Sequence, residues 1–244
     1  MRCQVVAFLV AATVISHSLL LADDWDPGLN LDQGVTLVSL GSSCEIAIQM
    51  QDHHLRKAAF PFDWLLTCNH DPSISLLEND FAFFLDDQYL IQHPVSPYVI
   101  ENCYYKVEFR HDWPSPELRD SATCYSQQLQ EMRVKYARRI NRFRDLAHYP
   151  GKVFFIRTAY DPQNDPNLYW GMEGIEQITA QEAQELKDVL ERYFPSLDFT
   201  LIIVNYIENN VKSINCIDKV VEFKISKHNK HSYYTNIFNA LLKL

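Results

Sequence analysis

The amino-acid sequence predicts an α/β protein with an open, mainly parallel sheet that has helices on both faces. Two observations lead to this prediction. Several segments are continuous runs of apolar and β-branched residues, which is typical of strands buried on both faces of a parallel sheet. Amphipathic helical segments alternate with these strands, and this alternation favours a three-layer α/β sandwich. We expect residues 34–244 to form this sandwich as a single domain.

Each element has its own signal in the chain. The predicted strands of the sheet are Val35–Leu40, Lys152–Arg157, Thr200–Val204 and Lys219–Phe223. The predicted helices cover Cys44–Met50, a segment near 73–78, a long polar stretch over 121–147, a segment that ends at Tyr193, and Tyr233–Leu242. Thr179 and Glu182 have the spacing of a capping box, which starts the helix that ends at Tyr193. Residues 54–115 are predicted to be irregular, apart from the short helix and a strand over Tyr104–Arg110.

Charge and motif content exclude several classes of function. The chain has 31 acidic residues against 22 Lys and Arg, a net charge of −9, and no basic run. This is the opposite of the basic surface that nucleic-acid binding requires, so no nucleic-acid partner is expected. The sequence contains no Walker A loop, dinucleotide-binding glycine pattern or Cys/His spacing typical of zinc. We therefore expect no metal or cofactor, and a small molecule or peptide as the substrate.

The first 22 residues have the pattern of a signal peptide. Arg2 precedes an apolar run over residues 5–15, and small residues follow. The alternative is a membrane anchor formed by residues 5–22, although His17 interrupts the apolar stretch that a span needs. We expect a secreted or extracytoplasmic protein with a polar lead-in at residues 23–33 and no stable membrane insertion after cleavage.

Cys44 is the strongest candidate for a catalytic residue. It follows a buried strand and a Gly-Ser-Ser turn, and good helix formers come after it. A thiol at the start of a helix lies close to backbone N–H groups and to the positive end of the helix dipole, and both favour the nucleophilic thiolate. The N–H groups of Ser43 and Cys44 could also stabilise an oxyanion. The alternative is a structural cysteine that packs as a small apolar residue.

A cysteine nucleophile needs a base, which is normally a histidine. His111 ends the predicted strand Tyr104–Arg110, and His231 precedes the final helix, so either could face the start of another helix. Asp63 lies between aromatic residues and could orient the histidine, as the third residue of a triad does. The alternative for Asp63 is that it caps a turn.

Arg157 ends an apolar strand, where a charged side chain needs a partner. It could hold a carboxylate or phosphate of the substrate, or it could form a structural pair with Asp161 or Glu208. Because ligands bind beyond the carboxyl ends of the strands in an open parallel sheet, Arg157 and the turn before Cys44 are expected at the same edge.

Three motifs resemble those of a known family. Ser39-Leu-Gly-Ser-Ser-Cys44, then Ala59-Phe-Pro-Phe-Asp-Trp-Leu65, and later Phe109-Arg-His-Asp112 occur in this order. Together they resemble a family of bacterial and viral domains described as papain-like cysteine peptidases, over residues 36–160. The resemblance implies Cys44 as nucleophile, His111 as base and Asp63 as a third member, and it implies a papain-like α+β fold as the alternative architecture.

The turn before Cys44 is also similar to the nucleophile turn of SGNH-type esterases, with cysteine in place of serine. That similarity implies His231 as the base. The expected function is therefore an exported cysteine-dependent hydrolase of the peptidase or amidase type. The alternatives are an acyl esterase or transferase acting on carbohydrate or lipid esters, and a non-catalytic extracytoplasmic binding domain.

Overall fold

The computed structural model describes residues 34–67, 71–93, 99–112, 122–160, 177–207, 213–226 and 230–243. The predicted signal peptide and lead-in, residues 1–33, lie outside the described residues. Within the described ranges, the structure contains no helix with the length and apolar character that a membrane span requires.

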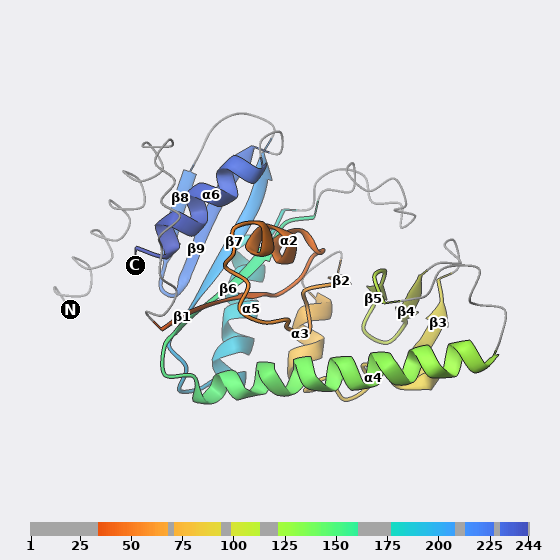
Figure 1. Ribbon diagram of the computed structural model, residues 1–244. Coiled ribbons are helices and arrows are strands. Elements are labelled where there is room, and N and C mark those ends of the chain that lie inside the picture. The colour runs from red at the N-terminus through yellow and green to blue at the C-terminus, as the bar shows by residue number, and fades with distance from the viewer. Residues whose placement is uncertain are drawn as a thin grey trace.

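The larger of two sheets has five strands and is mainly parallel (Figure 1). In spatial order its strands are β1 (Val35–Ser39), β6 (Lys152–Thr158), β7 (Phe199–Ile207), β9 (Val220–Ser226) and β8 (Ser213–Ile217). The first four strands are parallel, and β8 pairs antiparallel with β9 at one edge. The α/β class and the parallel sheet predicted from the sequence are confirmed. The sequence pattern did not predict β8, which is joined to β9 by a two-residue turn that contains Asp218 at φ 52°.

Helices cover both faces of this sheet, because successive residues of a buried strand point to opposite faces. On one face, Phe154 and Ile156 pack in a core with α2 (Glu45–Asp52) and α6 (Lys230–Leu241). On the other face, Val153 and Phe155 pack in a second core. That core includes α3 (Asp71–Glu78), α4 (Ala122–Asp145) and α5 (Ala180–Tyr193). The three-layer arrangement is therefore the predicted one.

Residues 65–109 contain a second sheet that sequence reasoning largely missed. Its antiparallel strands are, in spatial order, β2 (Leu65–Leu66), β5 (Val107–Phe109), β4 (Ile100–Asn102) and β3 (Leu90–Gln92). The predicted strand over Tyr104–Arg110 is shortened to β5, because residues 103–106 form a turn in which Lys106 adopts φ 58°. Strands of two or three residues are too short to show an alternating pattern, which explains why this region was expected to be irregular.

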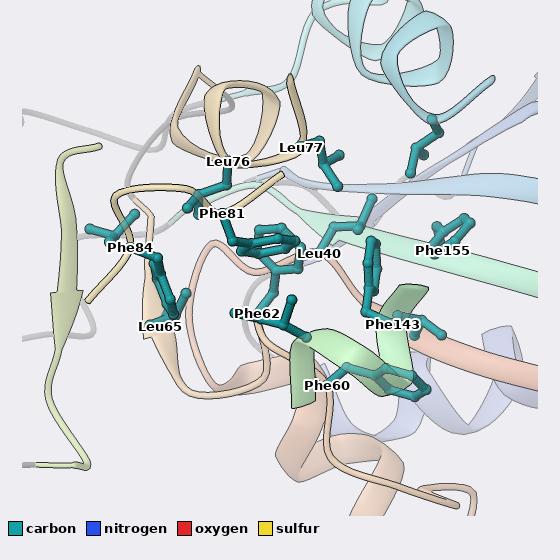
Figure 2. Close-up of a cluster of buried hydrophobic side chains, with 14 of the residues drawn as sticks. Leu40, Phe60, Phe62, Leu65, Leu76, Leu77, Phe81, Phe84, Phe143 and Phe155 are labelled. Atoms are coloured by element: carbon teal, nitrogen blue, oxygen red, sulfur yellow. The ribbon is translucent and has the colours of Figure 1, made fainter. Parts of the chain in front are cut away.

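Apolar side chains, many of them aromatic, join the small sheet, α3 and α4 to the large sheet (Figure 2). Phe143 of α4 lies at the centre of this core. Its ring centroid lies 5.8 Å from that of Phe62, 6.0 Å from that of Phe81 and 6.0 Å from that of Phe155. Because Phe155 belongs to β6 and Phe62 precedes β2, this core fixes the two sheets relative to each other.

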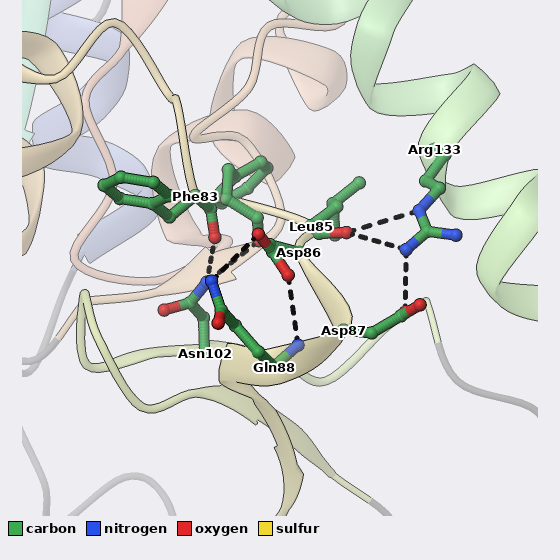
Figure 3. A network of polar contacts seen from close by, with 8 residues as sticks. Phe83, Leu85, Asp86, Asp87, Gln88, Asn102 and Arg133 are labelled. Carbon is green, nitrogen blue, oxygen red and sulfur yellow. Dashed lines mark hydrogen bonds and ion pairs between the residues drawn. The ribbon is translucent and has the colours of Figure 1, made fainter.

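Polar contacts hold the small sheet to α4 (Figure 3). The side-chain amide of Asn102 donates to the carbonyl oxygens of Phe83 and Phe84 at 2.7 and 3.0 Å. Arg133 of α4 donates to the carbonyl oxygen of Leu85 at 3.1 Å and to Asp87 at 2.7 Å. The segment between α3 and β3 is therefore clamped from both sides.

Candidate functional site

The turn after β1 has an unusual backbone. Gly41 and Ser42 both have positive φ, at 86° and 75°. A Cβ atom on Gly41 would lie 2.8 Å from Oγ1 of Thr67, so this position accepts only glycine without rearrangement. Ser42 has no such freedom, and a non-glycine residue in this region persists only where its surroundings hold it.

Ser42 is held by three hydrogen bonds and is 1% exposed. Its N–H donates to Oγ1 of Thr67 at 3.1 Å, and its carbonyl oxygen accepts from the N–H of Thr67 at 2.9 Å. Its hydroxyl lies 2.6 Å from that of Thr158, at the carboxyl end of β6. The turn is thus tied both to the end of β2 and to the neighbouring strand.

Arg157 supports the same turn through hydrogen bonds and is almost completely buried. Its Nη1 donates to the carbonyl oxygen of Leu40 at 3.1 Å and to Oγ1 of Thr67 at 2.5 Å, while Nη2 donates to the carbonyl oxygen of Thr67 at 2.8 Å. These contacts give Arg157 a structural role next to the site. Asp161 and Glu208, its predicted partners, lie outside the described residues.

Cys44 is the N-cap residue of α2, at φ −71° and ψ −4°, and its side chain makes no capping hydrogen bond. Ser43 supplies a side-chain acceptor instead, because its Oγ accepts from the N–H of Glu45 at 3.3 Å. Cys44 is half-buried and is not part of a disulfide. A thiol at this position is favoured as thiolate by the helix N-terminus, which is the arrangement that nucleophilic catalysis requires.

Asp63 lies in the Pro-Phe-Asp-Trp motif and is completely buried. Its Oδ2 accepts from Arg56 at 2.7 and 3.1 Å and from the N–H of Phe60 at 3.1 Å. Burial raises the pKa of Asp63, and the hydrogen bonds and charge of Arg56 act in the opposite direction. Oδ1 has no hydrogen-bond partner in the described part of the chain. These contacts connect Asp63 with Arg56, and its predicted role toward His111 stays a prediction.

His111 is exposed, and its ring packs edge-on against Trp64 with centroids 5.3 Å apart. The guanidinium group of Arg56 lies over the ring of the same Trp64, 5.3 Å from its centroid. Trp64 precedes β2, whereas Thr67, which binds Ser42, follows it. These contacts connect His111 with the residue before β2 and the Cys44 turn with the residue after it.

His231 lies in the first turn of α6 and contacts α2 instead. Its Nδ1 is 3.2 Å from Oε1 of Gln49, and its ring centroid is 4.7 Å from that of His53. Gln49 follows Cys44 by five residues, which is about 7.5 Å along a helix axis. Because Nε2 of Gln49 donates to Glu45 at 3.2 Å, a polar chain leads from His231 back to the first turn of α2.

The contact between His53 and His231 should make stability depend on pH. Burial and the neighbouring His231 lower the pKa of His53, although its bond to the carbonyl oxygen of Gln49 raises it. As the pH falls below 6.5, the unfolded chain binds this proton before the folded chain does. The free energy of unfolding should therefore decrease between about pH 7 and pH 5.

Urea unfolding of the His53→Gln variant across this pH range measures the contribution. The variant should show a shallower pH dependence than the parent protein. His148→Gln changes an exposed histidine that is not among the groups acting on His53, and it is the matched control, which should keep the parent's slope. Equal slopes for the parent protein and His53→Gln would contradict this account.

In the described ranges, no group of three His, Cys, Asp or Glu side chains is arranged to hold a metal ion.

A family model described as "Putative papain-like cysteine peptidase" matches residues 35–209. The chain belongs to this family. The matched range of the family contains Cys44, Asp63 and His111, whereas His231 lies beyond it.

The chain is also similar to an uncharacterized protein of Acanthamoeba polyphaga mimivirus. The two are 26% identical over 207 residues, which cover 76% of this chain and 85% of the viral protein. No solved structure matches the chain.

Sequence reasoning missed the residues that hold the turn. Thr67 and Thr158 carry no local signal, because each is a single threonine after a short or apolar strand. Two adjacent serines after Gly41 indicated the turn itself, and the positive φ of Ser42 follows from tertiary contacts that local sequence does not encode.

Proposed function

We propose that the protein is a cysteine-dependent hydrolase of the peptidase or amidase type, with Cys44 as its nucleophile. The observation that carries the proposal is the placement of a half-buried thiol at the N-cap of α2, after a turn held in a strained backbone conformation. Backbone strain maintained next to a potential nucleophile is typical of functional sites. The described family of the chain supports the same class of chemistry.

In the proposed reaction, the thiolate of Cys44 attacks the carbonyl carbon of the substrate and forms a tetrahedral intermediate. The N–H groups of Ser43 and Cys44 are the proposed donors to its oxyanion, because a turn ahead of a helix directs its backbone N–H groups outward. Protonated histidine then gives its proton to the leaving group, and an acyl-enzyme remains. Water, deprotonated by the same histidine, attacks the thioester and releases the carboxylic acid and the thiol.

His111 is the proposed base, with Asp63 as the proposed third member of the site, and His231 is the alternative base. The family match supports His111, since its range includes this residue. The contacts of His231 with Gln49 on the Cys44 helix support the alternative.

Alkylation of the thiols tests the reactivity of Cys44. Iodoacetamide should label Cys44 faster than Cys216, since burial raises the pKa of the Cys216 thiol. Both thiols are half-buried, so exposure alone predicts similar rates. Peptide mass spectrometry of a labelling time course at several pH values measures each rate separately. If Cys44 were labelled at the rate of Cys216 or more slowly, this result would argue against Cys44 as the nucleophile.

An acyl esterase or transferase is the second candidate. The parallel sheet supports it, because the Cys44 turn follows the carboxyl end of β1, where open α/β enzymes bind their ligands. Panels of peptide and ester substrates separate the two candidates. For either candidate, we propose a site of action outside the cytoplasm, which the signal-peptide pattern predicted at residues 1–22 supports.

A further inference from the structure

A pocket of about 380 Å³ lies between the start of α5 and the β7–β9–β8 half of the large sheet. This volume falls within the range of small-molecule sites, about 300–1,000 Å³. Ile203 and Ala183 line the pocket, and both belong to the core on the face of the large sheet that α5 covers. α2 packs on the opposite face of this sheet. The pocket is therefore separate from the Cys44 site.

Apolar side chains form most of the wall of this pocket, and they come from β7, β8, β9 and the segment before α5. They are Ile178, Ile203, Ile217 and Val220, together with two alanines of α5. Ile217 lies at the open edge of the sheet and is 62% exposed, which is high for an isoleucine. These walls suit an aliphatic group.

One carboxylate is fixed in the pocket. The side chain of Glu222 is 21% exposed, and its Oε1 accepts from Nδ2 of Asn205 at 2.7 Å. Asn205 is itself clamped to the backbone of Ile178 by two bonds of 2.8 Å, one to the N–H and one to the carbonyl oxygen. The ammonium of Lys224 is also nearest Oε1, at 3.6 Å. Because both contacts involve Oε1, Oε2 of Glu222 remains as an oriented acceptor for a ligand.

Two glutamines of the pocket wall also favour a ligand that donates hydrogen bonds, and the amide of Asn215 in the same wall can either donate or accept. Gln181 and Gln184 direct their amide nitrogens to Glu185 and Asp188 along α5, at 2.9 and 2.7 Å. Their amide oxygens are the polar atoms that can turn to a ligand. Among the described residues that line the pocket, Glu222 alone carries a charge.

The helix N-terminus at the mouth of the pocket does not provide an anion site. Thr179 and Glu182 form a complete capping box, in which the N–H of Glu182 donates to Thr179 Oγ1 at 3.2 Å and the N–H of Thr179 donates to Glu182 at 2.6 Å. The carboxylate of Glu182 already occupies the place that an anion would take.

From these contacts we infer that the pocket binds a small aliphatic primary amine, with its ammonium on Glu222 and its hydrocarbon body against Ile203, Ile217 and Val220. An ammonium has three donors and no acceptor, which matches a pocket that offers a carboxylate and amide oxygens. A charge-assisted hydrogen bond in a partly buried pocket also discriminates well against a neutral analogue of the same shape.

Isothermal titration calorimetry with n-hexylamine, n-hexanol and hexanoate tests this inference, because the three probes share an aliphatic body and differ in the polar group. The amine should bind at least about tenfold more tightly than the other two. Glu222→Gln keeps an oxygen for Asn205 and removes the charge, so it should remove this preference. Ile217→Ser, at an exposed position, should weaken the binding of hexylamine without removing its preference over hexanol.

Cys44→Ala is the control and should bind hexylamine as the parent protein does, because its site lies on the other side of the sheet. Three results would overturn the inference. They are equal affinities for hexylamine and hexanol, an unchanged amine preference in Glu222→Gln, or no saturable amine binding up to about 10 mM.

Discussion

Replacing Cys44 by alanine should reduce hydrolysis by at least about 10³-fold, because removal of a nucleophile abolishes the covalent route and leaves only the binding and oxyanion contributions. The same change should leave stability within about 0.5 kcal/mol of the parent protein. The sulfur makes no capping hydrogen bond, and Ser43 supplies the side-chain oxygen near the helix start. The two measurements are the initial rate on the best substrate of the peptide and ester panels, and the free energy of unfolding in urea.

Cys216→Ala removes another half-buried thiol and is the matched control. It should retain full activity, which separates loss of a nucleophile from loss of any thiol. If Cys44→Ala retained more than about a tenth of the activity, the proposed covalent mechanism would be wrong.

In the same assay, His111→Ala and His231→Ala identify the base. Only the variant that lacks the base should lose both its activity and one limb of the pH–rate profile.

Replacing Gly41 by alanine should lower the free energy of unfolding by about 2–4 kcal/mol and reduce activity more than tenfold. The added Cβ would lie 2.8 Å from Thr67 Oγ1 and 3.1 Å from Arg157 Nη1, at a φ of 86° that alanine disfavours. Either the turn or its hydrogen-bonded supports must then shift. A shift of about 1 Å in a nucleophile is enough to cost much of its reactivity.

Gly34→Ala provides a control for the backbone contribution. Gly34 also has a positive φ, 78°, but its added Cβ would meet nothing closer than 3.6 Å. This variant should lose about 1–2 kcal/mol of stability and keep its activity, since Gly34 does not contact the Cys44 turn. Similar losses of activity in the two variants would show that contact with Thr67 and Arg157 is not what fixes the site.

Sequence reasoning predicted the elements whose signal lies in consecutive residues, such as strands buried on both faces and helix starts with a local capping pattern. β1 and β6 are buried on both faces, so each is rich in apolar and β-branched residues without a polar alternation, and the helix start at Cys44 follows from Gly41 and the helix formers behind it. The capping box at Thr179 is also a local pattern, and the structure contains it.

The remaining features depend on contacts between distant residues. The bond between Ser42 and Thr67 spans 25 residues, and that between Leu40 and Arg157 spans 117, so neither leaves a periodic signal. The sequence therefore left two roles open for Arg157, substrate binding or a structural pair, and its described contacts are with the backbone and hydroxyl groups around the turn. The small antiparallel sheet escaped prediction for the same reason, since its short strands become recognisable only when paired.

The dependence of the Cys44 turn on Arg157 has a consequence during synthesis. A ribosome releases β1, α2 and the whole small sheet before it releases β6, so the nascent chain carries Cys44 long before Arg157 and Thr158 can support the turn. Closing so long a loop is also entropically costly and slow. The turn that carries Cys44 can therefore reach its final geometry only after β6 has left the ribosome.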